Sequence, residues 1–142
     1  MDKFTVYRIV FQNIRIDAHI NREYAVSMSM EVGASFSMNG VEYQTERSCQ
    51  VRAAPTRCPV RIYIPAARTG PLRGKLCIKP LLESAIFGDQ SDVYPFLEMM
   101  PMCFDIELQR GGSTTLSGYS RMTSGTTLYG VVIDDIQVRW SN

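Results

Sequence analysis

The sequence predicts an all-β protein, an antiparallel sandwich or barrel of about seven to nine strands with at most one short helix. Apolar and polar residues alternate from 24 to 38, a period of two that a helix cannot place on one face. Short apolar segments bounded by Gly and Pro then recur along the chain, which favours antiparallel strands over βαβ units. The 142 residues suffice for one domain, 1–142, with a substantial core.

The first expected strand is Phe4–Ile16, which is rich in β-branched and aromatic residues. The alternating segment that follows turns back at Asn39-Gly40, because both residues tolerate the positive φ of a type I′ turn. Continued without a break, this hairpin register places Arg47 on the apolar face, near an edge or with its charged end extended to solvent. The expected pairs are Met38 with Val41, Phe36 with Tyr43, Ser37 with Glu42, Ser35 with Gln44, Met30 with Cys49, and Met28 with Val51.

The rest of the chain contains shorter candidate elements. Leu81–Phe87 is the one plausible helix, and Ser113–Thr127, rich in Ser, Thr and Gly, is expected to be a mobile surface loop. Further strands are expected at Val60–Ile64, Leu76–Ile78, Cys103–Leu108, Leu128–Ile133 and Ile136–Trp140.

The four cysteines indicate no metal site. Cys49, Cys58, Cys77 and Cys103 include no CxxC pair, and His19 is the only histidine. No signal-peptide pattern and no membrane-spanning apolar run is present, so we expect a cytoplasmic protein that is neither secreted nor transmembrane. Reduced thiols are therefore expected, with two disulfides as the alternative.

The sequence contains no catalytic signature. His19 is the one possible imidazole base, and neither a G-x-S-x-G nucleophile nor a phosphate-binding G-K-[ST] loop occurs. We therefore expect no enzyme, no cofactor and no small-molecule substrate.

Charge is distributed in two blocks of opposite sign. Eight basic and no acidic residues lie between 47 and 82, whereas six acidic and no basic residues lie between 83 and 109. Arginine presents a planar fork of donors that suits phosphate, so the basic block predicts an anion-binding surface. The alternative is a scatter of solvated charges. The predicted anion-binding residues are Arg52, Arg57, Arg61, Arg68, Arg73, Lys75 and Lys79.

The segment 93–104 is dense in Tyr, Phe and Met and is broken by Pro95 and Pro101. It is expected either at the surface, as a docking or membrane-inserting element, or buried as a loop that closes one end of the core. Opposite charge blocks on one molecule also permit head-to-tail contacts between copies. The predicted self-association or docking residues are Asp89, Asp92, Tyr94, Phe96, Leu97, Glu98, Met99 and Met100.

Three segments resemble a known family. Lys3–Val10, Val60–Pro65 and Gly130–Trp140 are similar to strands of rhabdovirus matrix proteins, the last at the same end of the chain. The resemblance implies a small β-rich protein that self-assembles, binds anionic membranes peripherally and contacts nucleoprotein. Separately, Ser91-Asp92-Val93-Tyr94 resembles the S-D-P-Y of C2 domains.

Together, these observations predict a non-enzymatic, self-associating structural protein, plausibly viral and matrix-like, that contacts an anionic membrane or nucleoprotein through an Arg-rich surface. The expected partners are other copies of the chain and that anionic surface. Two alternatives remain open: a nucleic-acid-binding accessory module such as a viral silencing suppressor, and a C2-like lipid-binding module.

Overall fold

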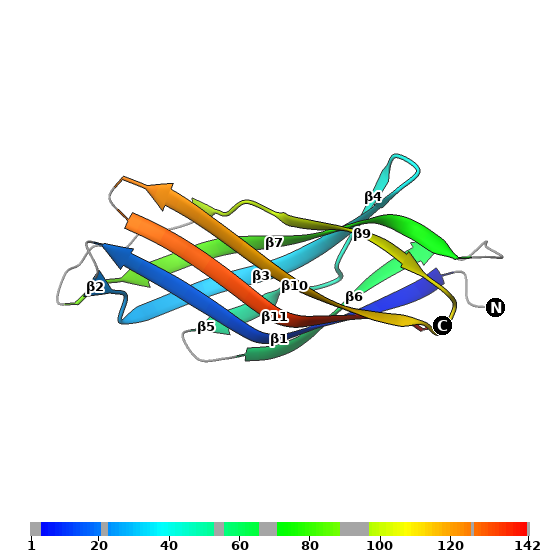
Figure 1. The fold of residues 1–142 in the computed structure, drawn as a ribbon, viewed down its shortest axis with the longest axis horizontal. Helices are drawn as coiled ribbons and strands as arrows, with labels where there is room; N and C mark the ends of the chain where they lie inside the picture. The colour runs from blue at the N-terminus through cyan, green and yellow to red at the C-terminus, as the bar shows by residue number, and fades with distance from the viewer. Residues whose placement is uncertain are drawn as a thin grey trace.

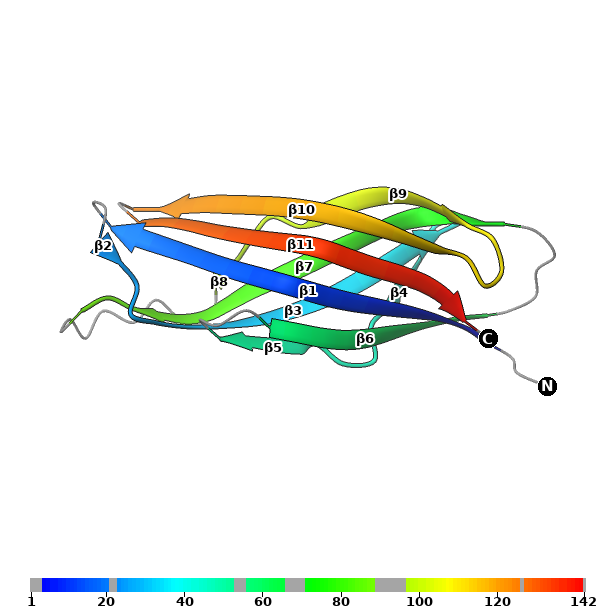
Figure 2. The ribbon, with the colours of Figure 1, turned by 60° about the horizontal axis from the view of Figure 1, so that its bottom comes forward.

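The computed structural model describes residues 4–20, 23–52, 56–65, 71–88, 97–125 and 127–141. These residues form an antiparallel sandwich of two sheets and eleven strands (Figures 1 and 2). The predicted all-β class is therefore confirmed. No helix in the described ranges is long and apolar enough to span a bilayer.

One layer, sheet A, is built around the strands nearest the two ends of the chain. They pair from Val6 opposite Ser141 to Ile20 opposite Thr127. The sheet runs from β10 (Ser113–Ser124) through β11 (Thr127–Ser141) to β1 (Phe4–Ile20), whose far edge is shared by β6 (Thr56–Pro65) and β2 (Glu23–Tyr24).

The second layer, sheet B, is built around a long central pair of strands. The strands on one side of this pair come from the predicted hairpin, and those on the other side come from the acidic block 83–109. The central strands are β3 (Ser27–Met38) and β7 (Leu72–Ile86); β4 (Val41–Gln44) and β5 (Cys49–Arg52) pair with β3, while β8 (Leu97–Glu98) and β9 (Met102–Leu108) pair with β7.

The core lies between the sheets and is filled by alternate residues of each strand. In β11 the alternation changes phase, because Ile133 and Ile136 are both fully buried although they are three residues apart. A β-bulge at this point opposes Asp134-Asp135 to Ser117 of β10, and Asp135 has a φ of 57°. The two strands expected on either side of Asp134-Asp135 are thus one strand whose halves both face the core. Its buried residues are Tyr129, Val131, Ile133, Ile136, Val138 and Trp140.

The predicted hairpin is confirmed around its turn and is wrong beyond it. Met38 pairs with Val41 and Ser35 with Gln44, as expected, but Cys49 pairs with Val32 rather than with Met30. The register shifts by two because the chain leaves sheet B after Gln44. Thr45 forms a bridge with Ile62 of β6 before β5 returns to β3. The expected pair of Met28 with Val51 is displaced in the same way, and Val51 instead pairs with Met30.

Two other expectations are corrected by the strand structure. The expected helix Leu81–Phe87 belongs mostly to β7, where a register shift pairs Ser29 with Ser84 but Met30 with Leu82. The shift leaves Leu82 and Ala85 buried three residues apart, a spacing that imitates a helix. The expected mobile loop 113–127 is a hairpin of β10 and β11, polar because β10 is a sheet edge with one exposed face.

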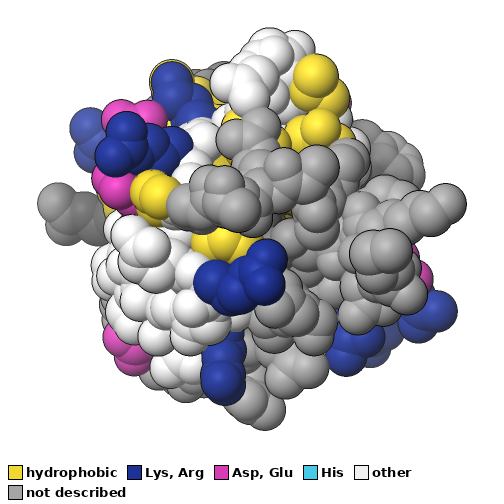
Figure 3. All heavy atoms as spheres, turned by 90° about the vertical axis from the view of Figure 1, so that its right-hand side faces the viewer, with side chains coloured by type: hydrophobic (Ala, Val, Ile, Leu, Met, Phe, Trp, Pro, Cys, Tyr) yellow, Lys and Arg dark blue, Asp and Glu magenta, His cyan; other side chains and the backbone are white. Residues whose placement is uncertain are grey.

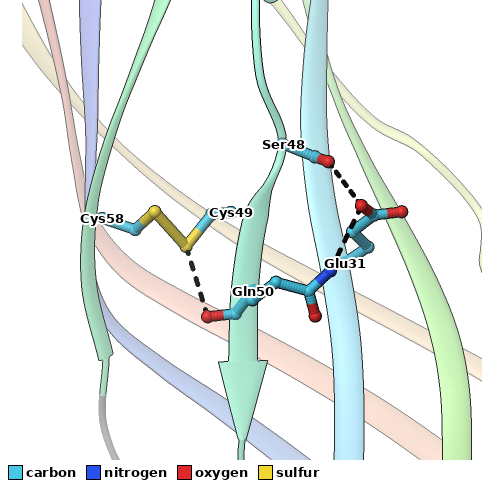
Figure 4. The surroundings of a disulfide bond; sticks show 5 residues. All are labelled: Glu31, Ser48, Cys49, Gln50 and Cys58. Atoms are coloured by element: carbon cyan, nitrogen blue, oxygen red, sulfur yellow. Dashed lines mark hydrogen bonds between the residues drawn. A yellow bond between two sulfur atoms is a disulfide. The ribbon is translucent and has the colours of Figure 1, made fainter.

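The expectation of reduced thiols is wrong: all four cysteines are in disulfides. Cys77 and Cys103 lie directly opposite each other on β7 and β9, so sheet pairing brings together residues 26 apart in the sequence. Cys49 of β5 and Cys58 of β6 join sheet B to sheet A (Figure 4). Neither proximity is visible in the cysteine spacing alone.

Candidate anion-binding face

On the outer face of sheet B, two cations form ion pairs with acids of the same chain. Arg73 Nη2 lies 3.1 Å from Glu107 Oε1, and Lys79 Nζ lies 2.6 Å from Glu42 Oε1. Lys75 stands opposite Asp105 in the β7–β9 register. The two charge blocks seen in the sequence thus meet on neighbouring strands of one molecule, and three of the predicted anion-binding residues lie beside carboxylates.

The Lys79 ion pair perturbs its carboxylate partner. The Glu42 pKa is lowered, first by the hydrogen bond from Lys79 and then by those from Gln44 and Ser35. Because the group is solvent-exposed, this pair identifies a locally satisfied charge rather than a large source of stability.

A second polar cluster on the same face connects β3, β5 and β7. Gln50 Nε2 donates to Glu31 Oε1 at 3.2 Å, and Ser48 Oγ donates to the same oxygen at 2.7 Å (Figure 4). Gln50 Nε2 also lies 3.0 Å from Glu83 Oε1. Neutral donors therefore satisfy these two carboxylates, next to the disulfide that joins the sheets.

The outer face of sheet A presents arginines without acidic partners. Arg61 of β6 and Arg139 of β11 are exposed, and neither forms an ion pair in the described part of the chain. In the strand register both stand directly opposite Arg8 of β1. These three positions, called the arginine row below, span three adjacent strands, or about 10 Å. Arg8 is included by its register position alone.

A fourth arginine approaches the β6 end of this row. The Glu46 N–H donates to the Arg61 carbonyl oxygen at 2.9 Å, which anchors the bend that carries Arg47. Arg47, Arg61 and Tyr63 line one surface hollow of about 390 Å³, and Glu46 also lines it. Tyr63 is 40% exposed, so an aromatic face is available beside the two guanidinium groups.

Of the other predicted cations that the structure describes, none lines this hollow. Arg52 is exposed at the end of β5, opposite Ser29 in sheet B. Arg57 lies within β6, but its side chain and the whole of Arg68 are outside the described residues. Viewed from the end that carries the termini, Lys and Arg side chains occupy several separate places, one of them interleaved with Asp and Glu (Figure 3). Of the predicted set, Arg61 is the member that the structure places in the arginine row.

Sequence reasoning missed Arg8 and Arg139. Each is a single arginine at an alternate position of an apolar strand, in the segments Val6–Val10 and Ile136–Trp140. The signal that could have identified them is this repeated pattern of one arginine within an apolar strand. Its meaning depends on the pairing of the first long strand with the last, which residue spacing does not reveal.

The predicted docking residues divide between the core and the surface. Met99 is buried, Leu97 is half-buried, and Glu98 and Met100 are exposed. Asp89, Asp92, Tyr94 and Phe96 lie outside the described residues, as does the segment compared with C2 domains. Within the described ranges no group of three or more His, Cys, Asp or Glu side chains is placed to hold a metal ion.

Fold and site together define a β-sandwich whose outer faces differ: Arg73 and Lys79 on sheet B are ion-paired, whereas Arg61 and Arg139 on sheet A form no ion pair with a described residue. Comparison of the chain with protein-family models, curated proteins and solved structures finds no match. The resemblance to rhabdovirus matrix proteins therefore remains a prediction.

Proposed function

We propose that the protein is a non-enzymatic, self-associating structural protein that contacts a phosphate-bearing anionic surface through sheet A. The observation that supports this most directly is the arginine row. Arg61 and Arg139 are exposed on one face and opposite Arg8, whereas Arg73 and Lys79 on the other face are ion-paired. A free guanidinium group offers a planar set of donors to phosphate oxygens, without first having to release a carboxylate.

An anionic membrane or a nucleoprotein is the partner that we expect. Each basic residue near an anionic bilayer contributes about 1 kcal/mol, so two exposed arginines would matter. The row lies on an open sheet face, which suits a flat or extended polyanion. A matrix-like viral role would use the same contacts.

Nucleic acid is the second candidate, favoured by one specific observation. Tyr63 and Tyr119 are exposed on the outer strands of sheet A, at 40% and 58%. Exposed aromatic rings beside arginines allow unpaired bases to stack while the phosphates bind. A protein that binds in this way would be the nucleic-acid-binding accessory module that the sequence leaves open.

The test is co-sedimentation over a salt series, with anionic vesicles and separately with single-stranded RNA. The variant R61Q/R139Q removes two unpaired arginines, and the matched control R73Q/K79Q removes two ion-paired cations. We expect the first to weaken binding about 30-fold, which corresponds to about 1 kcal/mol for each arginine. The control should have a much smaller effect.

Equal effects of the two variants on binding would refute the assignment of the anion-binding site to the outer face of sheet A. Binding to RNA without binding to vesicles would establish the second candidate instead. Wild-type protein that binds neither would reject the anionic partner, and the arginines would then be ordinary solvated surface.

The cellular setting is testable separately. The sequence predicts a cytoplasmic location, whereas two disulfides favour an oxidising environment or the surface of a particle. Cells that produce the protein are lysed in an alkylating agent, which traps free thiols, and mass spectrometry then counts the alkylated cysteines. The count distinguishes the reducing from the oxidising setting. Free thiols on all four cysteines would support the reducing setting.

A further inference from the structure

Strand β10 is the long open edge of sheet A. It has twelve residues and pairs on one side with β11, while no strand occupies its other side in the described sheet. The Trp140 N–H donates to the Gly112 carbonyl oxygen at 3.0 Å, and Ser113 and Thr115 follow in unbroken register. Because N–H and C=O groups alternate in direction along an antiparallel strand, those of Ser113 and Thr115 point away from β11.

The other edges carry features that hinder pairing with another chain, and β10 carries fewer of them. Short strands, prolines and charges are the usual protection. β4 and β5 have four residues each, β6 contains Pro59 and Pro65, and β9 carries Asp105 and Glu107 among seven residues. β10 contains no proline and no lysine, and Arg121 is its single charged residue.

Apolar surface accompanies this edge. A groove of about 550 Å³ lies between β10 and the beginning of β9 with the two residues before it, and it is lined by residues 100–104 and 117–121. Met100 is 71% exposed and Tyr119 is 58% exposed. The Ser120 hydroxyl donates to the Met100 carbonyl oxygen at 2.8 Å, which holds the two sides of the groove together. A strand added at β10 would cover part of this surface.

We infer that β10 pairs antiparallel with β10 of a second copy. The inference rests on the self-association in the proposed function and identifies the strand edge through which two copies would associate. An antiparallel edge is complementary to itself about a two-fold axis, so one patch suffices on both subunits. That axis is perpendicular to the sheet, and the outer faces of both copies therefore lie on the same side. The dimer would present two arginine rows to one anionic surface and gain affinity through bivalent contact.

The test is the monomer–dimer equilibrium of the full chain in sedimentation velocity experiments over a concentration series. The variant T115P removes an outward N–H from each copy and leaves the bonds to β11 in place. We expect the dimer dissociation constant to rise about 30-fold, since one hydrogen bond is lost from each subunit. The urea midpoint of the monomer should stay close to that of wild type, which shows that the fold is retained.

A second variant avoids proline altogether. T115K places a charge on the edge strand, whereas Q137K places the same charge opposite it on β11, one strand inside the sheet. The edge lysine should weaken the dimer markedly more than the inner one. A wild-type chain that stays monomeric, or a dimer that tolerates T115P and T115K, would overturn the inference. Its failure is separable from that of the anion-binding proposal, because R61Q/R139Q should reduce vesicle or RNA binding and leave the dimer intact.

Discussion

The two disulfides make different contributions that can be measured one at a time. Cys49–Cys58 closes a short loop between the sheets, and Cys77–Cys103 closes a longer loop within sheet B. With sequence separations of 9 and 26, restriction of the unfolded chain contributes about 2.6 and about 3.5 kcal/mol, respectively. Together these values are comparable with the whole stability of a small domain.

The perturbation is reduction of a protein that retains one disulfide. In C49A/C58A a reductant opens only Cys77–Cys103, and in C77A/C103A it opens only Cys49–Cys58. Each variant is its own reference, so the packing lost with buried Cys49 does not enter the comparison. Urea unfolding with and without a phosphine reductant then gives the two free-energy differences.

We expect reduction to cost C49A/C58A about 0.9 kcal/mol more than it costs C77A/C103A. A larger loss in C77A/C103A would show that the link between the sheets stabilises the native packing directly. No loss in either variant would refute the assignment of the disulfides, and peptide mapping under non-reducing conditions would check the pairing independently.

Two further predictions concern sheet B. A methyl group on Gly74 would meet the Phe36 ring, so G74A should lower the free energy of unfolding by about 1–3 kcal/mol. In the control G33A the nearest atom is 3.6 Å away, and a much smaller change in the urea midpoint is expected. For Glu42, whose pKa is lowered chiefly by Lys79, K79M should raise the pKa in a carboxyl NMR titration. The stabilisation is present above the unfolded-state pKa and lost as the pH falls through the folded pKa, so an unchanged titration in K79M would contradict the assignment.

Local patterning predicted the fold class, but pairing between distant segments decided the site. The turn at Asn39-Gly40 was predictable because its φ preferences are local. The register beyond Gln44 was not predictable, since it depends on a β-bridge between Thr45 and Ile62 of the other sheet. The bulge near Leu82 similarly concealed a strand, because one extra residue changes which side chains are buried.

The same limit applies to the candidate site. The basic block was visible in the sequence, but its residues divide between the two faces of the sandwich. Arg73 and Lys79 proved to be ion-paired, whereas Arg139, far from the block, stands in the same row as Arg61. Charge counts along a chain carry no information about register, which alone determines these neighbours.

The pairing of β1 with β11 has a consequence for how the molecule is made. Twelve register positions join segments more than a hundred residues apart, from Val6 with Ser141 to Ile20 with Thr127. Sheet A therefore remains incomplete during synthesis until β11 has left the ribosome, while sheet B has all its strands earlier. Chains dominated by such distant contacts fold in milliseconds to seconds, so we expect slow refolding and an early intermediate in which β1 is paired with β6 but still lacks β11 on its other side. In that interval the nascent chain would be most vulnerable to aggregation and would depend most on chaperones.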